Sequence, residues 1–150
     1  MIRFGDNYAE IEMPYRGSTM NGMLLWLDEH LIKQWWNLSE AKIEPKTGGV
    51  FYLRWPVKED RGSRVIYGIL DELDTEAGSF SVKKIIYMND GTKMSGFVLE
   101  VLFIRYSESN SAIKVRLSHP LDSSTKVFFD KSVLKSWPGA LALFRKFVEY

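Results

Sequence analysis

Hydrophobic and polar positions alternate near the start of the chain. Over residues 8–13 the apolar Ala9, Ile11 and Met13 fall on one face of an extended segment, with glutamates between them. Side chains of a strand point alternately to its two faces, so this pattern predicts a half-buried strand. A proline and a glycine follow, and we expect them to end the strand.

The hydrophobic period lengthens after Ser18. Apolar residues then recur at steps of three and four, which places them on one stripe of a helix. The stripe consists of Met20, Met23, Leu24, Leu27, Leu31 and Trp35. Ser18 or Thr19 can cap its start. The pattern predicts one helix, or two short helices joined near residues 28–30, followed by a loop at 37–40.

Five more strands are predicted between turns rich in glycine, proline and asparagine. They cover residues 50–55, 64–73, 79–87, 94–106 and 112–118. Gly68 falls inside one of them, where a bulge or a close packing contact would explain the missing side chain. The strand at 94–106 is apolar on both faces, which indicates that both are covered. The chain therefore has six predicted strands, with a charged hairpin loop at 58–63.

The C-terminal region returns to a helical period. One stripe consists of Val133, Trp137, Leu141, Phe144 and Val148. Pro138 removes a backbone donor and clashes with the carbonyl four residues back. Either Ser136 caps a fresh helix with Pro138 in its first turn, or a longer helix kinks there. The segment after Pro138 is helical in both versions, and we expect it to cover the apolar sheet.

Composition narrows the class of protein. The chain has 150 residues, 45% hydrophobic and 26% charged, which fits one globular domain over residues 1–150. A net charge of +1 without a dense basic patch argues against a nucleic-acid partner. No run approaches the ~18 apolar residues of a membrane span, and the first residues show no signal-peptide pattern, so we expect a soluble, cytoplasmic protein. The absence of Cys excludes disulfides and thiolate chemistry and is compatible with a reducing compartment.

Short motifs along almost the whole chain carry a resemblance to a known superfamily. They are Trp35-Trp36, Pro45 with Gly48-Gly49-Val50-Phe51, Gly68-Ile69, Val115-Arg116-Leu117-Ser118-His119, and Ser136-Trp137 with Leu141 and Phe147. In these residues and in its order of elements the chain resembles the helix-grip fold of the START and birch-pollen-allergen superfamily. Within it, the chain is similar to the C-terminal domain of the activator of the 90-kDa heat-shock-protein ATPase, which bacteria carry as stand-alone proteins. That branch usually has a Val-Trp pair early in its first helix, where this chain has Gly22-Met23.

The resemblance implies an α+β fold: a curved six-stranded antiparallel sheet wrapped around a long C-terminal helix, with two short helices after the first strand. Such proteins leave an apolar cavity between sheet and helix, which many use for lipids, steroids or polyketides. We expect its lining to come from Trp35, Phe51, Tyr67, Phe97, Phe103, His119, Trp137, Leu141 and Phe144. A closed void of about 300 Å³ would cost on the order of 7 kcal/mol, so a ligand, water or aromatic side chains must fill it.

Groups that could support a reaction are few. His30 and His119 show no metal-ligand spacing, so neither a metal nor another cofactor is expected. His119 could donate a proton at the cavity mouth, but its place beside a proline at a strand end favours a hydrogen bond to a loop carbonyl. Glu100 would be a candidate base if it faced inward. If its neighbours Leu99 and Val101 point inward, however, strand alternation places Glu100 on the outward side.

Arginines and tryptophans offer the remaining candidates. Arg54, Arg105 or Arg116 could hold a ligand carboxylate, although solvated positions on the sheet suit them better. Trp35 and Trp36 could gate the cavity or bind a partner, while at least one of them fits the core.

The sequence favours a binding module with no assigned catalytic residue, which takes a small apolar or amphipathic ligand between the sheet and the C-terminal helix. One alternative is a co-chaperone-like domain that contacts a heat-shock chaperone or another protein in a stress response. The other is a small polyketide-cyclase-type enzyme, for which Glu100, Tyr67 and His119 are the available titratable groups. A monomer and a homodimer both fit, since a long sheet edge could support pairing.

Overall fold

One antiparallel sheet holds all the strands that the structure describes. The computed structural model describes residues 2–57, 64–89, 91–120 and 136–149. The strand order across the sheet is β1-β2-β8-β7-β6-β5-β4-β3. The strands are β1 (Ile2–Phe4), β2 (Tyr8–Arg16), β3 (Glu40–Ile43), β4 (Val50–Trp55), β5 (Arg64–Asp74), β6 (Ser79–Asn89), β7 (Thr92–Arg105) and β8 (Asn110–Ser118). The described helices are α1 (Thr19–Leu27), α2 (Glu29–Trp35) and α4 (Trp137–Val148).

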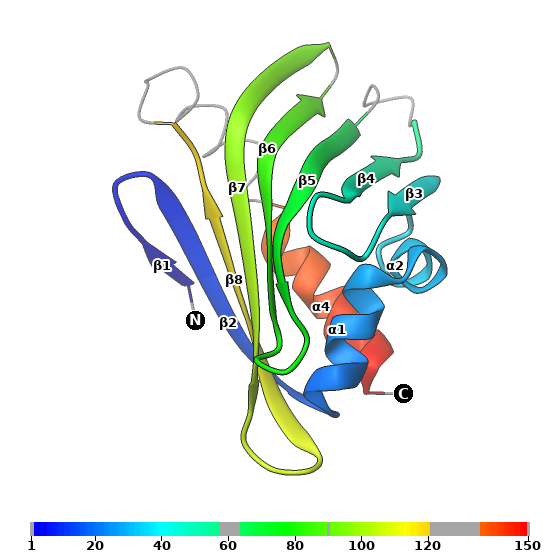
Figure 1. Cartoon of the computed structure of the whole chain (residues 1–150), viewed down its shortest axis with the longest axis vertical. Helices are drawn as coiled ribbons and strands as arrows, with labels where there is room; N and C mark the ends of the chain where they lie inside the picture. Colours follow the sequence, from blue (N-terminus) through cyan, green and yellow to red (C-terminus); the bar gives the residue numbers. More distant parts are fainter. Residues whose placement is uncertain (1, 58–63, 90, 121–135, 150) are drawn as a thin grey trace.

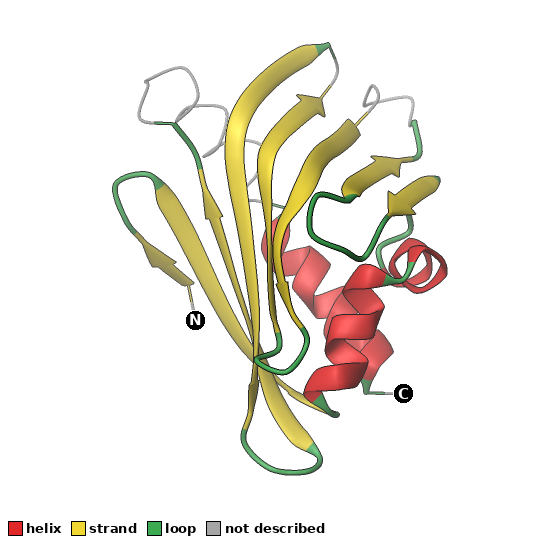
Figure 2. Cartoon of the chain, in the orientation of Figure 1, coloured by secondary structure: helices red, strands yellow, loops and turns green. Residues whose placement is uncertain are grey.

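The helices gather on one side of the curved sheet, as Figures 1 and 2 show. We call the face of the sheet toward them the inner face and the opposite one the outer face. The inner face carries the apolar residues of alternating strand positions, such as Phe51, Leu53, Val101 and Val115, each almost completely buried. This arrangement confirms the α+β helix-grip fold. None of the described helices is long and apolar enough to span a membrane.

The sheet has eight strands rather than the predicted six. The two additional strands, β1 and β3, are the outermost ones, with three and four residues. All three residues of β1 are exposed, so the segment has no buried face to produce an alternating pattern. Pairing with β2 and β4 defines these short edge strands, and pairing leaves no signature in the segment's own sequence.

The first helical segment consists of two helices, and Asp28 joins them. Its carboxylate accepts hydrogen bonds from the backbone N–H groups of His30 (2.9 Å) and Leu31 (3.1 Å), which caps α2. Its own N–H donates to the carbonyl of Leu24 at 3.0 Å and closes α1. The junction predicted near residues 28–30 is confirmed.

The predicted stripe along this segment is correct at Met23 but wrong at Met20 and Leu24. Met20 and Leu24 are 72% and 50% exposed, whereas Trp26 is fully buried. The chain turns at the Asp28 junction, so α1 and α2 bury different sides, and one continuous stripe cannot describe both. The buried tryptophan of α1 thus comes one turn after Gly22-Met23.

Gly22 allows α1 to lie directly on the sheet. A Cβ atom at this position would meet the Tyr15 hydroxyl and come 2.7 Å from Phe103 Cε1. That hydroxyl donates a hydrogen bond to the carbonyl of Ser18 at 2.8 Å, at the start of the same helix. The missing side chain is therefore a requirement of close helix–sheet contact.

The irregularity predicted at Gly68 is confirmed. The pairing of β5 with β6 shifts register between Tyr67 and Ile69. A Cβ on Gly68 would lie 2.6 Å from Val82 Cγ1, so close packing also excludes a side chain.

The C-terminal helix begins after Ser136 and has Pro138 in its first turn, as one of the two predicted versions requires. The side chain of Ser136 makes no capping hydrogen bond. Trp137, Leu141 and Phe144 form its buried side. Val133 and the predicted loop at 58–63 lie outside the described residues.

Candidate functional site

All five tryptophans of the chain lie in one cluster between the helices and the inner face. Trp36 is its centre: its ring centroid lies 5.0 Å from that of Trp35, 5.5 Å from Trp26, 5.2 Å from Trp55 and 5.4 Å from Trp137. Aromatic pairs at such separations add stability beyond the area they bury. The cluster therefore links α1, α2, β4 and α4 into one packed unit.

A hydrogen bond anchors the corner from which this cluster projects. The indole Nε1 of Trp35 donates to the carbonyl of Leu25 at 2.6 Å, between α2 and α1. Asn37, directly after the tandem tryptophans, has a positive φ of 53°, an uncommon conformation that Asn tolerates. Together these features turn the chain so that Trp36 faces the sheet.

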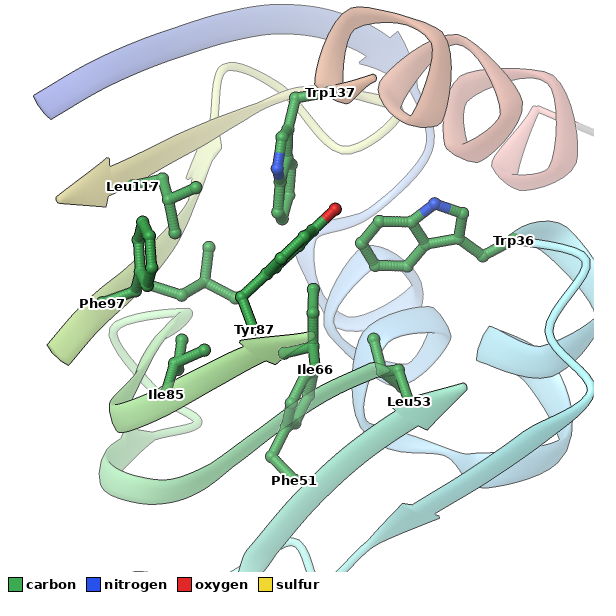
Figure 3. Close-up of a pocket in the computed structure, with 10 residues that line it drawn as sticks. Trp36, Phe51, Leu53, Ile66, Ile85, Tyr87, Phe97, Leu117 and Trp137 are labelled. Carbon is green, nitrogen blue, oxygen red and sulfur yellow. The ribbon is translucent and has the colours of Figure 1, made fainter. Parts of the chain in front are cut away.

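The inner face and Trp137 of α4 enclose a small apolar cavity, shown in Figure 3. Its lining consists of Trp36, Phe51, Leu53, Ile66, Ile85, Tyr87, Phe97, Leu99, Leu117 and Trp137. The volume of this cavity in which the centre of a water molecule could lie is about 10 Å³. That is at the lower limit of about 10–15 Å³ needed for a single water molecule, so the cavity is almost completely filled by its own side chains.

One polar group of the lining reaches across this cavity. Tyr87 extends from β6 toward Trp36 and Trp137, with its hydroxyl at the tip (Figure 3). The hydroxyl accepts a hydrogen bond from Nη2 of Arg64 at 3.2 Å. The Arg64 guanidinium also lies 4.8 Å from the centre of the Trp55 ring, a cation–π contact.

Arg64 is a cation on the inner face with no anion among the described residues in ion-pair contact. It pairs with Trp55 across β4 and β5, which places it on the same face as Ile66 and Leu53. Its Nε is buried and has no hydrogen-bond partner, and Arg64 makes no ion pair within the part of the chain that the structure describes. A guanidinium so placed presents an unused donor next to an apolar cavity.

The residues predicted to line the cavity fall into three groups. Phe51, Phe97 and Trp137 line it. Trp35, Phe103, Leu141 and Phe144 are buried in the core beside it, with Phe144 centred 5.5 Å from Trp35 and 6.3 Å from Phe103. His119 and Tyr67 lie elsewhere.

Tyr67 lies on the outer face, and its predicted inward orientation is wrong. It is 44% exposed and contacts Tyr52 of the neighbouring strand edge to face, with centroids 6.2 Å apart. Because β5 is apolar on both faces, alternation alone does not distinguish its inner from its outer side.

His119 is buried at the end of β8, in a hydrogen-bonded corner. Its Nδ1 lies 2.7 Å from the carbonyl oxygen of Pro120, as the loop-carbonyl interpretation expects. Its backbone N–H donates to the carbonyl of Asn7 at 2.8 Å, and the Asn7 amide donates back to the His119 carbonyl at 3.2 Å. These bonds tie β8 to the turn before β2.

The other polar candidates lie on the outer face or in solvent. Arg54 pairs with Glu40 at 3.3 Å and Arg116 with Glu10 at 3.0 Å, while Arg105 and Glu100 are exposed. None of these four reaches the cavity. Arg64 was missed because it is the first residue of β5, where a charge is indistinguishable from the preceding polar loop; its signal is the even spacing to Ile66 and Gly68.

Burial changes the pKa of Tyr15, a β2 residue at the start of α1. Tyr15 is 3% exposed, and this burial raises its pKa to about 12. Its phenol therefore stays neutral at pH values where an exposed tyrosine ionises. Among the described residues, no group of three or more His, Cys, Asp or Glu side chains is placed to hold a metal ion.

Comparison with solved structures supports the fold. A crystal structure of protein Ms6760 from Mycobacterium smegmatis matches with a TM-score of 0.79 at 10% identity, covering 97% of this chain and 94% of that one. A protein from Rhodobacter sphaeroides matches with a TM-score of 0.75 at 12% identity, covering 99% and 94%. The di-domain ARO/CYC protein BexL of the BE-7585A biosynthetic pathway matches with a TM-score of 0.74 at 11% identity over 95% of this chain and 46% of that one.

Sequence comparison identifies the family. A search of curated proteins finds no match. The model of the family described as "Activator of Hsp90 ATPase homolog 1-like protein" matches residues 24–142, which is most of the chain and includes α2, the sheet from β3 to β8 and the start of α4. The chain belongs to this family of helix-grip proteins.

Proposed function

We propose that this protein is a binding module for a small amphipathic molecule with an acidic group, held between the sheet and α4. The observation that carries the proposal is Arg64, an inner-face cation with a buried, unpartnered Nε at the edge of an apolar cavity. We assign no reaction to the site.

The chemistry of Arg64 selects the acidic group. A charged group removed from water is unfavourable unless a counter-charge or hydrogen bonds compensate it. A carboxylate or phosphate would supply both, because the planar guanidinium donates two parallel bonds to such an anion. The Tyr87 hydroxyl lies 3.2 Å from Nη2 and would be close to the same anion.

The apolar part of the ligand would take the place of side chains that now fill the cavity. With about 10 Å³ of free space, no lipid-sized molecule fits unless an aromatic ring moves. Trp36 directly follows α2 and Trp137 begins α4, so neither ring belongs to the sheet, and these are the rings we expect to move. Because side chains fill the cavity when no ligand is bound, the unliganded protein also avoids the loss of stability that an empty void would cause.

Thermal shift and native mass spectrometry test the proposal. We expect a fatty acid of suitable length to raise the melting temperature, since a ligand at 100 times its dissociation constant adds about 2.7 kcal/mol. The corresponding alcohol, which lacks the negative charge, should stabilise much less. The variant Arg64→Met should lose the preference for the acid, while Arg105→Met, at an exposed arginine, should retain it.

Two results would contradict the proposal. Equal stabilisation by acid and alcohol would remove the role of Arg64. No stabilisation by any fatty acid, sterol or aromatic polyketide, together with no co-purifying mass, would mean that the cavity is a plain core.

A second candidate is a protein-interaction domain that acts on a chaperone ATPase, as the family description suggests. The observation in its favour is that α1 exposes Met20 and Leu24, two large apolar side chains one turn apart. Under this function, the purified chain should stimulate the ATPase of a 90-kDa heat-shock chaperone, and Met20→Ser/Leu24→Ser should reduce the stimulation.

A further inference from the structure

A row of polar side chains crosses the outer face of the sheet. Strand pairing places one residue from each of six neighbouring strands side by side: Glu72, Ser81, Glu100, Arg116, Glu10 and Arg3. We call these six residues the outer polar row. Since paired strands are about 4.8 Å apart, neighbours along the row can contact each other. The row lies on the face opposite the aromatic cavity, so nothing in the proposed function uses it.

The arginine end of the row is internally neutralised. Glu10 is 6% exposed and accepts from Arg3 Nη2 at 2.8 Å and from Arg116 Nε at 3.0 Å. Arg116 also lies over the ring of Tyr8, at 4.2 Å from its centre. Both arginines are therefore directed to Glu10, although Arg116 is also the strand neighbour of Glu100.

At the other end of the row, no cation among the described residues forms an ion pair with the carboxylates. Glu72 and Glu100 flank Ser81 on the two adjacent strands and make no hydrogen bond or ion pair with the described residues. Lys83, two residues after Ser81, pairs with Asp71 at 2.8 Å; this partner, and to a smaller extent the charges of Glu72 and Glu100, raise the pKa of Lys83. Lys114 and Arg116 of β8, two strands away from Ser81, also line the groove.

Ser81 supplies an independent sign of a ligand. It is only 8% exposed, and its hydroxyl is out of contact with solvent and has no hydrogen-bond partner in the described part of the chain. Buried hydroxyls in native proteins normally have a partner. Ser81, Glu72 and Glu100 all line an open groove of about 270 Å³ on the outer face.

We propose that this groove binds a primary ammonium group, which donates its three N–H bonds to Glu72, Ser81 and Glu100. An ammonium group has three donors and no acceptor, and the site presents two carboxylates and a hydroxyl. A divalent metal ion suits the site less well, because Ca²⁺ takes about 6–8 oxygen ligands and Mg²⁺ requires octahedral geometry. The ammonium can come from a free amine or from a lysine side chain.

Titration of the ¹⁵N-labelled full chain, followed by two-dimensional NMR, tests the proposal. The probes are 1,4-diaminobutane as the free amine and a short lysine peptide as the chain-borne one; the tighter of the two identifies the source. We expect saturable shifts of backbone amides around Ser81 on β5, β6 and β7. Tetramethylammonium, which has the same charge but no N–H donors, should produce no saturable shift at the same concentration.

Variants separate the site from general charge effects. Glu72→Gln/Glu100→Gln should weaken amine binding at least tenfold, and Ser81→Ala should weaken it several-fold with an otherwise unchanged spectrum. Glu108→Gln, an exposed acid in the turn between β7 and β8, should bind like the unmodified chain. Equal binding by the double variant or by tetramethylammonium, or tighter binding of Mg²⁺ or Ca²⁺ than of either amine, would overturn the proposal.

Discussion

The two faces of the sheet treat charge in opposite ways. On the outer face, buried Glu10 has two arginine partners within 3.0 Å. On the inner face, Arg64 has a tyrosine hydroxyl and an aromatic ring but no ion pair among the described residues. The same sheet thus holds a satisfied buried anion and an unsatisfied partly buried cation.

This difference suits the two charges to different roles, one in stability and one in ligand binding. A buried charge with full compensation holds neighbouring strands together, while a buried charge without it lowers stability and marks a place where a ligand can supply the missing partner. Substitutions on the two faces, and in the aromatic cluster that covers the inner face, should therefore change the free energy of unfolding by different amounts.

Removing an indole from the aromatic cluster should have the largest effect. Trp137 is 5% exposed and stacks on Trp26 with a centroid separation of 6.4 Å and an interplanar angle of 13°. Trp137→Ala should lower the free energy of unfolding by about 3–5 kcal/mol, measured by urea denaturation. Trp137→Phe, which keeps an aromatic ring, should lose clearly less. A loss below about 1 kcal/mol for the alanine variant would show that Trp137 contributes little to the core.

Alkaline pH should weaken the contact between α1 and the sheet through Tyr15. Burial raises its pKa to about 12, whereas in the unfolded chain it ionises near the ordinary value of 10.0. The unfolded state therefore binds fewer protons than the native state above pH 10, so stability falls as pH rises, by on the order of 2–3 kcal/mol once pH exceeds the native pKa. This contribution is fully present below pH 10.

The control is Tyr15→Phe, which keeps the ring packed on Phe144 at 5.4 Å but cannot ionise. Its unfolding free energy should fall less steeply between pH 9 and 12 than that of the unmodified chain. Parallel curves would mean that Tyr15 reaches solvent when it ionises.

On the outer face, neutralising Glu10 should destabilise the protein moderately. Glu10→Gln removes the negative charge and one of the two oxygens that accept from the two arginines, although the Arg3 side chain is 62% exposed and can be hydrated. We expect a loss of about 1–2 kcal/mol at low salt, reduced at high salt by screening. Glu76→Gln, at an exposed turn position, should change stability by less than about 0.5 kcal/mol. A salt-independent loss would contradict the electrostatic explanation.

On the inner face, removing the cation should have the opposite sign and the smallest size. Arg64→Met keeps an unbranched apolar chain of similar length and removes the charge. The free energy of unfolding of the ligand-free protein should rise by about 1 kcal/mol, because an uncompensated charge no longer has to be desolvated. A loss of stability comparable to that of Glu10→Gln would remove the proposed contrast between the two faces.

Sequence patterns predict those parts of the fold that repeat a strict period. Phe51, Phe97 and Phe103 alternate with neighbours that the structure leaves half-buried or exposed, and all three phenylalanines are buried as expected. Tyr67 is placed wrongly because the inner and outer sides of β5 are both apolar before Gly68, where the strand also shifts register. Met20 and Leu24 fail because the helical phase changes at Asp28.

Residues that act across strands lie beyond the reach of such patterns. Glu72, Ser81 and Glu100 are neighbours only because β5, β6 and β7 pair in one particular register, which includes irregularities on both sides of β6. The environment of Arg64 likewise depends on Trp55 and Tyr87, which belong to two other strands. Local periodicity determines which face of the sheet a residue occupies, whereas the pairing register of the strands determines which residues lie next to it.

The clustering of all five tryptophans has an optical consequence. Because Trp36 lies within 5.5 Å of each of the other four indoles, absorbed light is shared among rings that belong to α1, α2, β4 and α4. The tryptophan fluorescence and the tryptophan bands of the near-ultraviolet circular dichroism spectrum therefore report on one location, the contact between the helices and the inner face. A movement of either Trp36 or Trp137 changes that signal directly, so the protein carries its own label-free sensor of opening.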